Sequence, residues 1–350
     1  MTRKRWCLTA LALLAAMLCA VIALVAVVDP FEIYHRALFY QPAYASETQM
    51  YANAGVAKSY DYDSIIIGTS VTENCRPSVY AQALGGSFVK LCMNGGLARD
   101  HAKMMDIALR THDVRRVVYG LDLFAFSQYP TNQKAVTPDY LYDDSLLNDT
   151  SYWFNESVLL RYLPQALRRI GTVPDDSARD SMYFWDPPEL PGRERLITQL
   201  DWTAPLGESR PADALEEFTA GNYEQNLLPY IEAHRDTVFD VFFPPYSLLY
   251  WVKQAQKGEL EVRLAQRRQL AGLLLSEPNV RLFDFQANTA WTQSFELYFD
   301  DIHYISVVND GMAQALAAGE WRVLELAQIE TASEAIRQDA LAFYAAHAAQ

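Results

Sequence analysis

The fold can be inferred from one stretch, Tyr62-Asp63-Ser64-Ile65-Ile66-Ile67-Gly68-Thr69-Ser70. Three consecutive isoleucines are β-branched, and such a short apolar run suits a strand that is buried on both faces of a parallel sheet. A glycine closes the run, and a Thr-Ser pair follows it directly. We therefore predict a buried strand over residues 62–68, with Ser70 at its carboxyl end.

The next sixty residues alternate between helical and extended patterns. A helix is expected over Val71–Leu84, with Pro77 either within its first turns or marking its start. A strand over Ser87–Met93, a helix over Ala98–Thr111 and a strand over Arg116–Leu123 follow. This βαβαβ order requires crossover connections, so it predicts parallel strands with helices on both faces.

Residues 124–211 interrupt this pattern, because they are rich in Tyr, Pro, Asp and Trp. We interpret them as an insertion at a strand end, where α/β enzymes usually shape their substrate pockets. Regular patterns then resume: a helix near Ala212–His234, a strand over Thr237–Phe243, a helix over Ser247–Ser276, a strand over Val280–Phe285 and one or two helices over Val307–Ala349. The prediction is a doubly wound, mainly parallel five-stranded α/β domain over residues 61–350, preceded by an aromatic stalk over 29–60 that packs on it.

The first 28 residues predict a membrane anchor. Arg3-Lys4-Arg5 precedes an uncharged stretch of 23 residues from Trp6 to Val28, and about 20 apolar residues suffice to cross a bilayer. A cleaved signal peptide is the alternative, although its apolar region is usually shorter, about 7–15 residues. The basic cluster places the N-terminus in the cytoplasm and the rest of the chain outside, in a single-pass cell-membrane protein.

Charge and cysteine content exclude some classes of function. The 350-residue chain has 29 Lys and Arg against 43 Asp and Glu, a formal net charge of −14, which disfavours nucleic acid as a partner. No His/Cys spacing suits zinc and no loop suits calcium, so we expect neither a metal nor a cofactor. Cys75 and Cys92 lie in the exported part, where isolated thiols and a single disulfide both remain open.

Ser70 and His303 are the candidate catalytic residues. A serine between a parallel strand and a helix lies at the sheet edge where ligands bind, although serine is also a common helix N-cap. A nucleophilic serine needs a base, and the base needs a carboxylate that orients it. Asp300 and His303, three residues apart after the last strand, supply both; the alternative is that Asp300 and Asp301 cap a helix that begins near Ser306.

These blocks, in this order, resemble the SGNH/GDSL hydrolases. Gly68-Thr69-Ser70 is similar to the first block of that family, and Asp300-x-x-His303 to its last block. Leu91-Cys92-Met93-Asn94-Gly95-Gly96 occupies the place of the second block, whose glycine donates a backbone N–H to the oxyanion hole. Gly120-Leu121-Asp122 occupies the place of the third, where the family has an oxyanion-binding Asn and this chain has Asp122. The resemblance covers roughly residues 60–320.

The resemblance implies roles for further residues. The oxyanion would be held by N–H groups of Ser70 and of Gly95 or Gly96, with Asn94 as an alternative donor, since a carboxylate such as Asp122 only accepts hydrogen bonds. Independently of the resemblance, Glu73 lies three residues after Ser70 and Tyr246 follows the strand over 237–243 at the same sheet edge, so both are expected to line the pocket. The alternatives are that Glu73 is an acid favoured in a first helical turn and that Tyr246 belongs to a rigid turn.

The membrane anchor followed by these blocks indicates a narrower group. This arrangement resembles most closely the single-pass SGNH-like proteins of Gram-positive bacteria, and it is similar to that of the proteins that assist D-alanylation of lipoteichoic acid and O-acetylation of alginate. This implies a serine esterase or O-acyltransferase that acts on an acylated envelope glycan or polymer, with a membrane-bound O-acyltransferase as partner. The alternative functions are a non-catalytic scaffold for such an acyltransferase and a glycan-binding surface protein built around the aromatic insertion.

Overall fold

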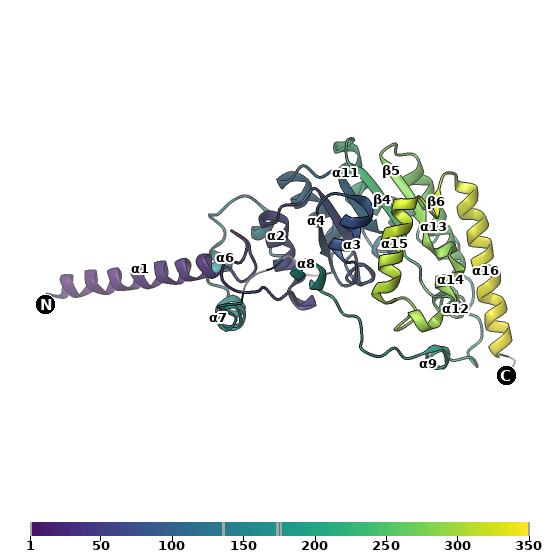
Figure 1. Ribbon diagram of the computed structural model, residues 1–350, viewed down its shortest axis with the longest axis horizontal. Helices are drawn as coiled ribbons and strands as arrows, with labels where there is room; N and C mark the ends of the chain where they lie inside the picture. The colour runs from purple at the N-terminus through teal and green to yellow at the C-terminus, as the bar shows by residue number, and fades with distance from the viewer. Residues whose placement is uncertain (1, 135–136, 173–174, 176, 349–350) are drawn as a thin grey trace. The chain divides into compact units, whose positions relative to one another are not determined.

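A six-stranded, mostly parallel sheet with helices forms the larger of two compact units (Figure 1). The computed structural model describes residues 2–134, 137–172, 175 and 177–348, so the predicted helix end at Ala349 lies outside the described residues. Unit 1 comprises residues 1–60 and 137–178, and unit 2 comprises 61–136 and 179–350. Part of the expected insertion therefore belongs to the same unit as the N-terminal segment.

The sheet of unit 2 has the strand order β2-β1-β3-β4-β5-β6. β1 lies between β2 and β3 and pairs in parallel with both, so the chain changes direction across the sheet at the carboxyl ends of β1 and β3. Such a switch point is where open α/β sheets bind ligands. The strands are β1 Ser64–Gly68, β2 Phe88–Cys92, β3 Arg116–Gly120, β4 Val238–Phe243, β5 Val280–Asp284 and β6 Arg322–Val323.

The predicted mainly parallel α/β architecture is confirmed, but the number of strands was wrong. The sixth strand, β6, has only two residues and pairs antiparallel with β5. A two-residue strand carries no periodic signal, and the tertiary pairing alone defines it. The three isoleucines of β1 are fully buried, as expected for a strand covered on both faces.

The helices of unit 2 begin and end close to the expected positions, but two of those expected are each divided. Pro77 marks the start of the helix expected over 71–84, which is one of its two predicted roles, because residues 70–72 form a 3₁₀ turn. The helix expected near 212–234 is divided at Leu227, and the one over 247–276 is divided at Gly258, whose φ is +71°. The longer helices are α3 Pro77–Leu84, α4 Ala98–Thr111, α10 Glu216–Asn226, α12 Leu248–Gln256, α13 Leu260–Leu275, α15 Ser306–Ala318 and α16 Leu326–Ala348; the shorter are α9 Arg193–Ile197, α11 Leu228–Ala233 and α14 Thr289–Thr292. The short helix α8 Ser177–Ser181 begins in unit 1 and ends in unit 2.

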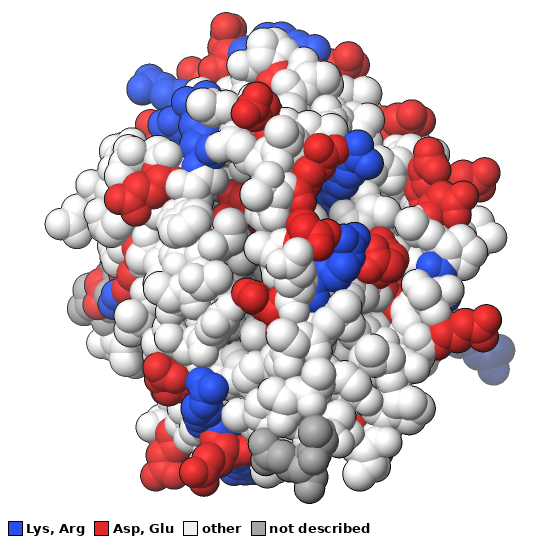
Figure 2. All heavy atoms as spheres, turned by 90° about the vertical axis from the view of Figure 1, so that its right-hand side faces the viewer, with Lys and Arg blue, Asp and Glu red and all other residues white. Residues whose placement is uncertain are grey.

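The surface of unit 2 is acidic but mixed. On the face shown in Figure 2, Asp and Glu side chains are scattered and interspersed with fewer Lys and Arg side chains. No extended basic area is visible on that face. Charged side chains of both signs, interspersed in this way, keep a protein surface well hydrated.

Unit 1 begins with the long apolar helix α1, Arg3–Val28, which is long and apolar enough to cross a membrane. The rest of unit 1 contains α2 Gln49–Ser59, α5 Asp139–Tyr142, α6 Thr150–Trp153, a π turn over Val158–Tyr162 and α7 Leu163–Leu167. The sequence predicted no helix within the stalk over residues 29–60, but α2 lies there. This helix is almost entirely buried and therefore shows no amphipathic period.

Candidate active site

Ser70 and His303 are in direct contact. Oγ of Ser70 lies 2.7 Å from Nε2 of His303, and Nδ1 of the same imidazole lies 2.7 Å from Oδ2 of Asp300. A carboxylate placed in this way holds the imidazole in the tautomer that accepts the hydroxyl proton. The structure thus brings together the three residues that the sequence singled out for nucleophilic catalysis.

The turn after β1 is held tightly around Ser70. Gly68 has a φ of +157°, and a side chain there would approach within 2.7 Å of the Thr72 side chain and 3.0 Å of the Gly120 carbonyl. Thr72 Oγ1 donates to the Thr69 carbonyl at 2.8 Å. Ser70 is the first residue of the 3₁₀ turn, and its hydroxyl contacts His303 rather than a helix N-terminus.

The loop before α15 folds around the Asp300 carboxylate. Oδ1 accepts the backbone N–H groups of Ile302 at 2.9 Å and His303 at 2.7 Å, which leaves Oδ2 for the imidazole. The alternative that Asp300 and Asp301 cap α15 is wrong. The first N–H of that helix, on Ser306, donates instead to Asp186 at 3.0 Å.

The charges around His303 favour its protonated form. Burial by itself lowers the pKa of His303, but the hydrogen bond and charge of Asp300, together with the charges of Asp122 and Glu73, outweigh burial and raise the pKa above its usual 6.5. Burial likewise opposes ionisation of Asp300, but its bonds to His303 and Ile302 leave its pKa below the ordinary value. An imidazolium formed during proton transfer is therefore stabilised.

Asp122 acts as a hydrogen-bond acceptor at the end of β3. Its Oδ2 accepts from Thr69 Oγ1 at 3.1 Å, and its Oδ1 accepts from the N–H of Phe124 at 2.9 Å. Asp122 thereby connects the turn after β3 to the turn that carries Ser70, the candidate nucleophile. An ionised carboxylate cannot donate to an oxyanion, so Asp122 does not replace an Asn in that role.

The glycine loop after β2 offers fewer donors than expected. The N–H of Gly96 already donates to the Met93 carbonyl at 2.9 Å, which removes it as an oxyanion donor in this conformation. Gly95 has a φ of +59° and is half-buried, and Asn94 is exposed. Of the two expected glycines, Gly95 is the one whose backbone remains a candidate donor.

Glu73 and Tyr246 are buried rather than open to a ligand. Glu73 is 1% exposed, and its backbone carbonyl accepts from Lys90 Nζ at 2.6 Å. Tyr246 is 2% exposed. Burial, and then the charge of Asp122, raise the pKa of Tyr246 well above its usual value. Both side chains influence the site through charge and packing, because neither presents a surface that a substrate can touch.

A segment that sequence reasoning missed, residues 179–186, lies against the nucleophile turn. The Trp185 ring packs edge-on against the His303 imidazole, with centroids 5.4 Å apart, and its Nε1 donates to the Ser70 carbonyl at 3.2 Å. The next residue, Asp186, accepts from Asn74 Nδ2 at 2.7 Å. Trp185 therefore fixes both members of the Ser–His pair.

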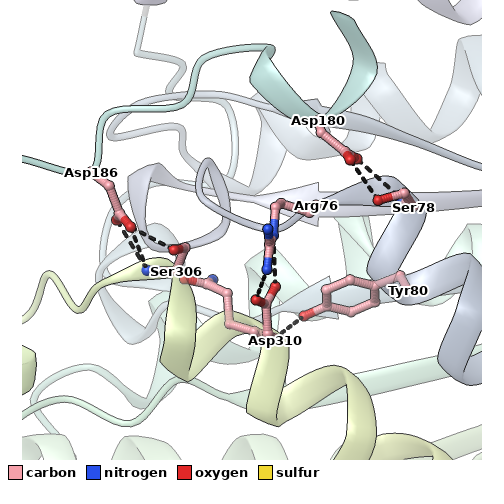
Figure 3. Close-up of polar contacts among 8 residues, drawn as sticks. Arg76, Ser78, Tyr80, Asp180, Asp186, Ser306 and Asp310 are labelled. Atoms are coloured by element: carbon pink, nitrogen blue, oxygen red, sulfur yellow. Dashed lines mark hydrogen bonds and ion pairs between the residues drawn. The ribbon is translucent and has the colours of Figure 1, made fainter. Parts of the chain in front are cut away.

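Two aspartates hold this segment at its ends (Figure 3). Asp180 accepts the N–H of Ser78 on α3 at 2.9 Å, and Asp186 accepts the N–H and the hydroxyl of Ser306 on α15. Arg76 and Asp310 form an ion pair between the same two helices. The segment is thus attached to both helices that flank the nucleophile turn.

Lys90 stabilises the same region from within the sheet. This β2 lysine is 1% exposed, and its ammonium donates to the carbonyls of Glu73, Cys75 and Asp180 at 2.6, 3.0 and 3.2 Å. Burial lowers the pKa of Lys90. One cation therefore ties the loop after Ser70 to the segment that carries Trp185.

The two cysteines of unit 2 are not bonded to each other. Cys75 and Cys92 are free buried thiols, and their sulfur atoms contact Asn309 Nδ2 at 3.2 Å and Thr72 Oγ1 at 3.1 Å. Among the residues that the structure describes, no group of three or more His, Cys, Asp or Glu side chains is arranged to hold a metal ion.

Comparisons with known proteins give no family. Neither a scan against protein-family models nor a search of curated proteins yields a match for this chain. The geometry of the site is therefore the basis for assigning a function.

Proposed function

We propose that the chain is a membrane-anchored, serine-dependent acyl-ester hydrolase or O-acyltransferase of the SGNH type. The observation that supports it most is the pair of 2.7 Å hydrogen bonds that joins Ser70 to His303 and His303 to Asp300. Two such bonds in series at the switch point of a parallel sheet match the requirements of nucleophilic acyl chemistry.

In the proposed reaction, Ser70 Oγ attacks the carbonyl carbon of an ester while His303 Nε2 takes the hydroxyl proton. His303 then donates that proton to the leaving alkoxide oxygen, and an acyl ester of Ser70 remains. Water or a glycan hydroxyl, deprotonated by His303, then attacks the acyl carbonyl, and His303 returns the proton to Ser70 Oγ as the acyl group leaves. Asp300 keeps the proton of the imidazole on Nδ1 during both steps.

Aromatic surface beside the triad supports a glycan or acyl substrate. The Trp185 ring lies 6.5 Å from that of Phe299, whose side chain is 47% exposed, and Trp185 itself is partly exposed. Aromatic faces bind the apolar faces of sugars and acyl chains while leaving hydroxyls solvated. We propose an acylated envelope glycan or polymer as the substrate class.

The apolar helix α1 supports a site of action at a membrane. Its N-terminal Arg3-Lys4-Arg5 favours a cytoplasmic N-terminus, and the triad would then act at the outer membrane face. A membrane-bound O-acyltransferase that supplies the acyl group is the partner we propose.

The second candidate function is a non-catalytic scaffold for such an acyltransferase. Two observations favour it: Asp122 only accepts hydrogen bonds, and the Gly96 N–H is engaged with Met93. An oxyanion hole with few donors would reduce acyl transfer by about 10²–10³ for each missing donor. The same fold would then bind the glycan without transferring the acyl group.

A fluorophosphonate probe separates the two candidates. The full-length chain in detergent should be labelled at Ser70, with labelling absent in Ser70→Ala and strongly reduced in His303→Ala. Ser151→Ala, which removes an exposed serine of unit 1, is the matched control and should be labelled normally. A folded protein that the probe does not label would contradict catalysis and favour the scaffold.

A further inference from the structure

The segment over residues 159–170 of unit 1 has a positive net charge, opposite in sign to that of the whole chain. It contains Arg161, Arg168 and Arg169 and no acidic residue, whereas the whole chain has a formal net charge of −14. Arg161 forms an exposed ion pair with Glu47 at 3.0 Å, which a lipid phosphate would have to replace. A local basic cluster in an acidic protein points to an anionic partner at this position.

The same segment exposes apolar side chains on one side. The π turn Val158–Tyr162 continues directly into α7, and Val158, Leu163 and Ala166 are buried. Leu160 is 74% exposed and Leu167 36% exposed, seven residues apart or about two helical turns. The helix therefore presents leucines to the outside, with the exposed Arg161 and Arg168 each one residue further along.

Two more exposed apolar residues extend this surface. Ile170 is 56% exposed and pairs with Tyr40 in an antiparallel bridge, while the N–H of Gly171 donates to the Phe39 carbonyl at 2.9 Å. This pairing brings Leu38, which is 69% exposed, to the end of the segment. We call Leu38, Leu160, Leu167 and Ile170 the apolar patch.

The apolar patch belongs to the part of unit 1 that holds the end of α1. Helices α6 and α7 contact α1, as Figure 1 shows, and Val25 and Val28 of α1 are buried. The carbonyl of Ala26 lies 2.9 Å from His35 Nε2, and the carbonyl of Asp29 accepts from Tyr40 OH at 2.8 Å. These bonds satisfy carbonyls at the helix end, so α1 enters unit 1 as a fixed element.

The length of α1 places this contact at the membrane surface. Its 26 residues span about 39 Å at 1.5 Å per residue, whereas the hydrocarbon core is about 30 Å thick. The charged residues 3–5 lie outside this core, so the apolar part of the helix, Trp6 to Val28, spans about 35 Å and roughly its last three residues extend into the headgroup region. Because α6 and α7 contact α1, and Val25 and Val28 near its end are buried, we place the α6–α7 segment at the same depth.

We infer that the apolar patch inserts into the outer leaflet of an anionic membrane beside α1, with Arg161 and Arg168 binding lipid phosphates. Leucine and isoleucine side chains gain free energy at the acyl boundary, and guanidinium groups match phosphate oxygens at the headgroups. This inference rests on the membrane-anchor part of the proposed function and is independent of catalysis.

Fluorescence quenching in nanodiscs tests the insertion on the full-length chain. The discs contain phosphatidylcholine and phosphatidylglycerol, and the background carries Cys7→Ser and Cys19→Ser; Cys75 and Cys92 are fully buried and stay. An environment-sensitive nitrobenzoxadiazole label is placed at Leu160→Cys or Leu167→Cys. It is then quenched either by brominated lipid or by iodide in the water.

Two further label sites serve as controls. Gln165→Cys is exposed on the same helix but about 140° round from residue 160, so this label should respond to iodide. The native Cys19, kept in a Cys7→Ser background, reports whether α1 is in the bilayer. We expect the labels at 160 and 167 to be quenched by brominated lipid as the label on Cys19 is.

Each outcome decides the inference. If the label on Cys19 is quenched by brominated lipid while the labels at 160 and 167 respond only to iodide, α1 lies in the bilayer but the apolar patch is not inserted. If Cys19 is not quenched by lipid either, the anchor and the insertion both fail. Labels at 160 and 167 that neither quencher reaches would show that a protein covers the apolar patch, which also overturns the inference.

The arginines provide an independent test. Quenching of the label at 160 by brominated lipid should be stronger in discs with phosphatidylglycerol than in discs with phosphatidylcholine alone. The double substitution Arg161→Gln and Arg168→Gln should abolish this difference. A difference that survives the substitution would contradict the assigned role of the arginines.

Discussion

Replacing Asp300 by Asn tests the triad most directly, because the structure predicts a specific defect. The amide oxygen of Asn can still accept the N–H groups of Ile302 and His303, as Oδ1 of Asp300 does at 2.9 and 2.7 Å. The loop should therefore keep its shape. The amide NH₂ then replaces Oδ2 and faces Nδ1 of His303, where two donors cannot both be accommodated.

The imidazole resolves this conflict by moving its proton to Nε2. That proton points at Ser70 Oγ, 2.7 Å away, so the nitrogen can no longer accept the hydroxyl proton. A wrong tautomer in a Ser–His–Asp triad costs about 10⁴ in rate, or roughly 5.5 kcal/mol of barrier. We expect a loss of this order in the rate at which the probe labels Asp300→Asn.

The pH dependence gives a second readout of the same substitution. The base must be neutral, and the pKa of His303 is raised. The labelling rate of the native chain should therefore rise with pH, with the midpoint of this rise (the pH limb) above 6.5. Without the charge of Asp300, burial lowers the pKa of His303, so the pH limb should move to lower pH.

The assay measures the rate of labelling by intact-protein mass spectrometry across pH, with circular dichroism as a test of folding. The control is Asp301→Asn, which removes the carboxylate next in sequence; that group forms an ion pair with Lys253 and none with His303. Its labelling rate should stay within about twofold, since this partly exposed ion pair does not contact the imidazole. Asp300→Asn with a native rate, or with the pH limb unmoved, would refute the triad.

Three further substitutions test the surroundings of the triad. Asp122→Asn removes a negative charge near His303, so the pH limb of labelling should move to lower pH. It also introduces an amide donor, so labelling should be faster. An unchanged pH profile would count against the electrostatic role of Asp122. Trp185→Phe keeps an aromatic ring but loses the hydrogen bond to the Ser70 carbonyl. The loss of about 1 kcal/mol should slow labelling about fivefold. Equal labelling rates would show that the indole N–H has no positioning role. Lys90→Met leaves three buried carbonyls without their donor, so the free energy of unfolding should fall by about 1–3 kcal/mol and the melting temperature in detergent should drop; an unchanged melting temperature would contradict this.

Local patterns were sufficient wherever the determining forces act over a few residues. The three isoleucines of β1 and the apolar run of α1 are recognisable because burial and membrane insertion both depend on composition over a short window. The Asp300–His303 pair is also local, since three residues separate the carboxylate from the imidazole that it orients.

Long-range contacts were beyond the reach of the sequence alone. Trp185 lies 115 residues from Ser70 in an insertion without periodicity, and nothing in its neighbourhood marks it as a partner of the imidazole. The same holds for Asp186, which caps α15 from 120 residues away, and for the two-residue strand β6. Such contacts follow from how separate elements pack, which short-range propensities do not encode.

The parallel α/β domain, the apolar N-terminal helix and the candidate set Ser70, Asp300 and His303 could be inferred from the sequence, because each depends on local composition or spacing. Three features became apparent only after folding: Ser70 and His303 meet across 233 residues, Asp122 accepts from Thr69 and Phe124, and the Gly96 N–H is already used. Hydrogen bonds are directional and short-ranged, so the role of each polar group depends on the atoms that folding places beside it.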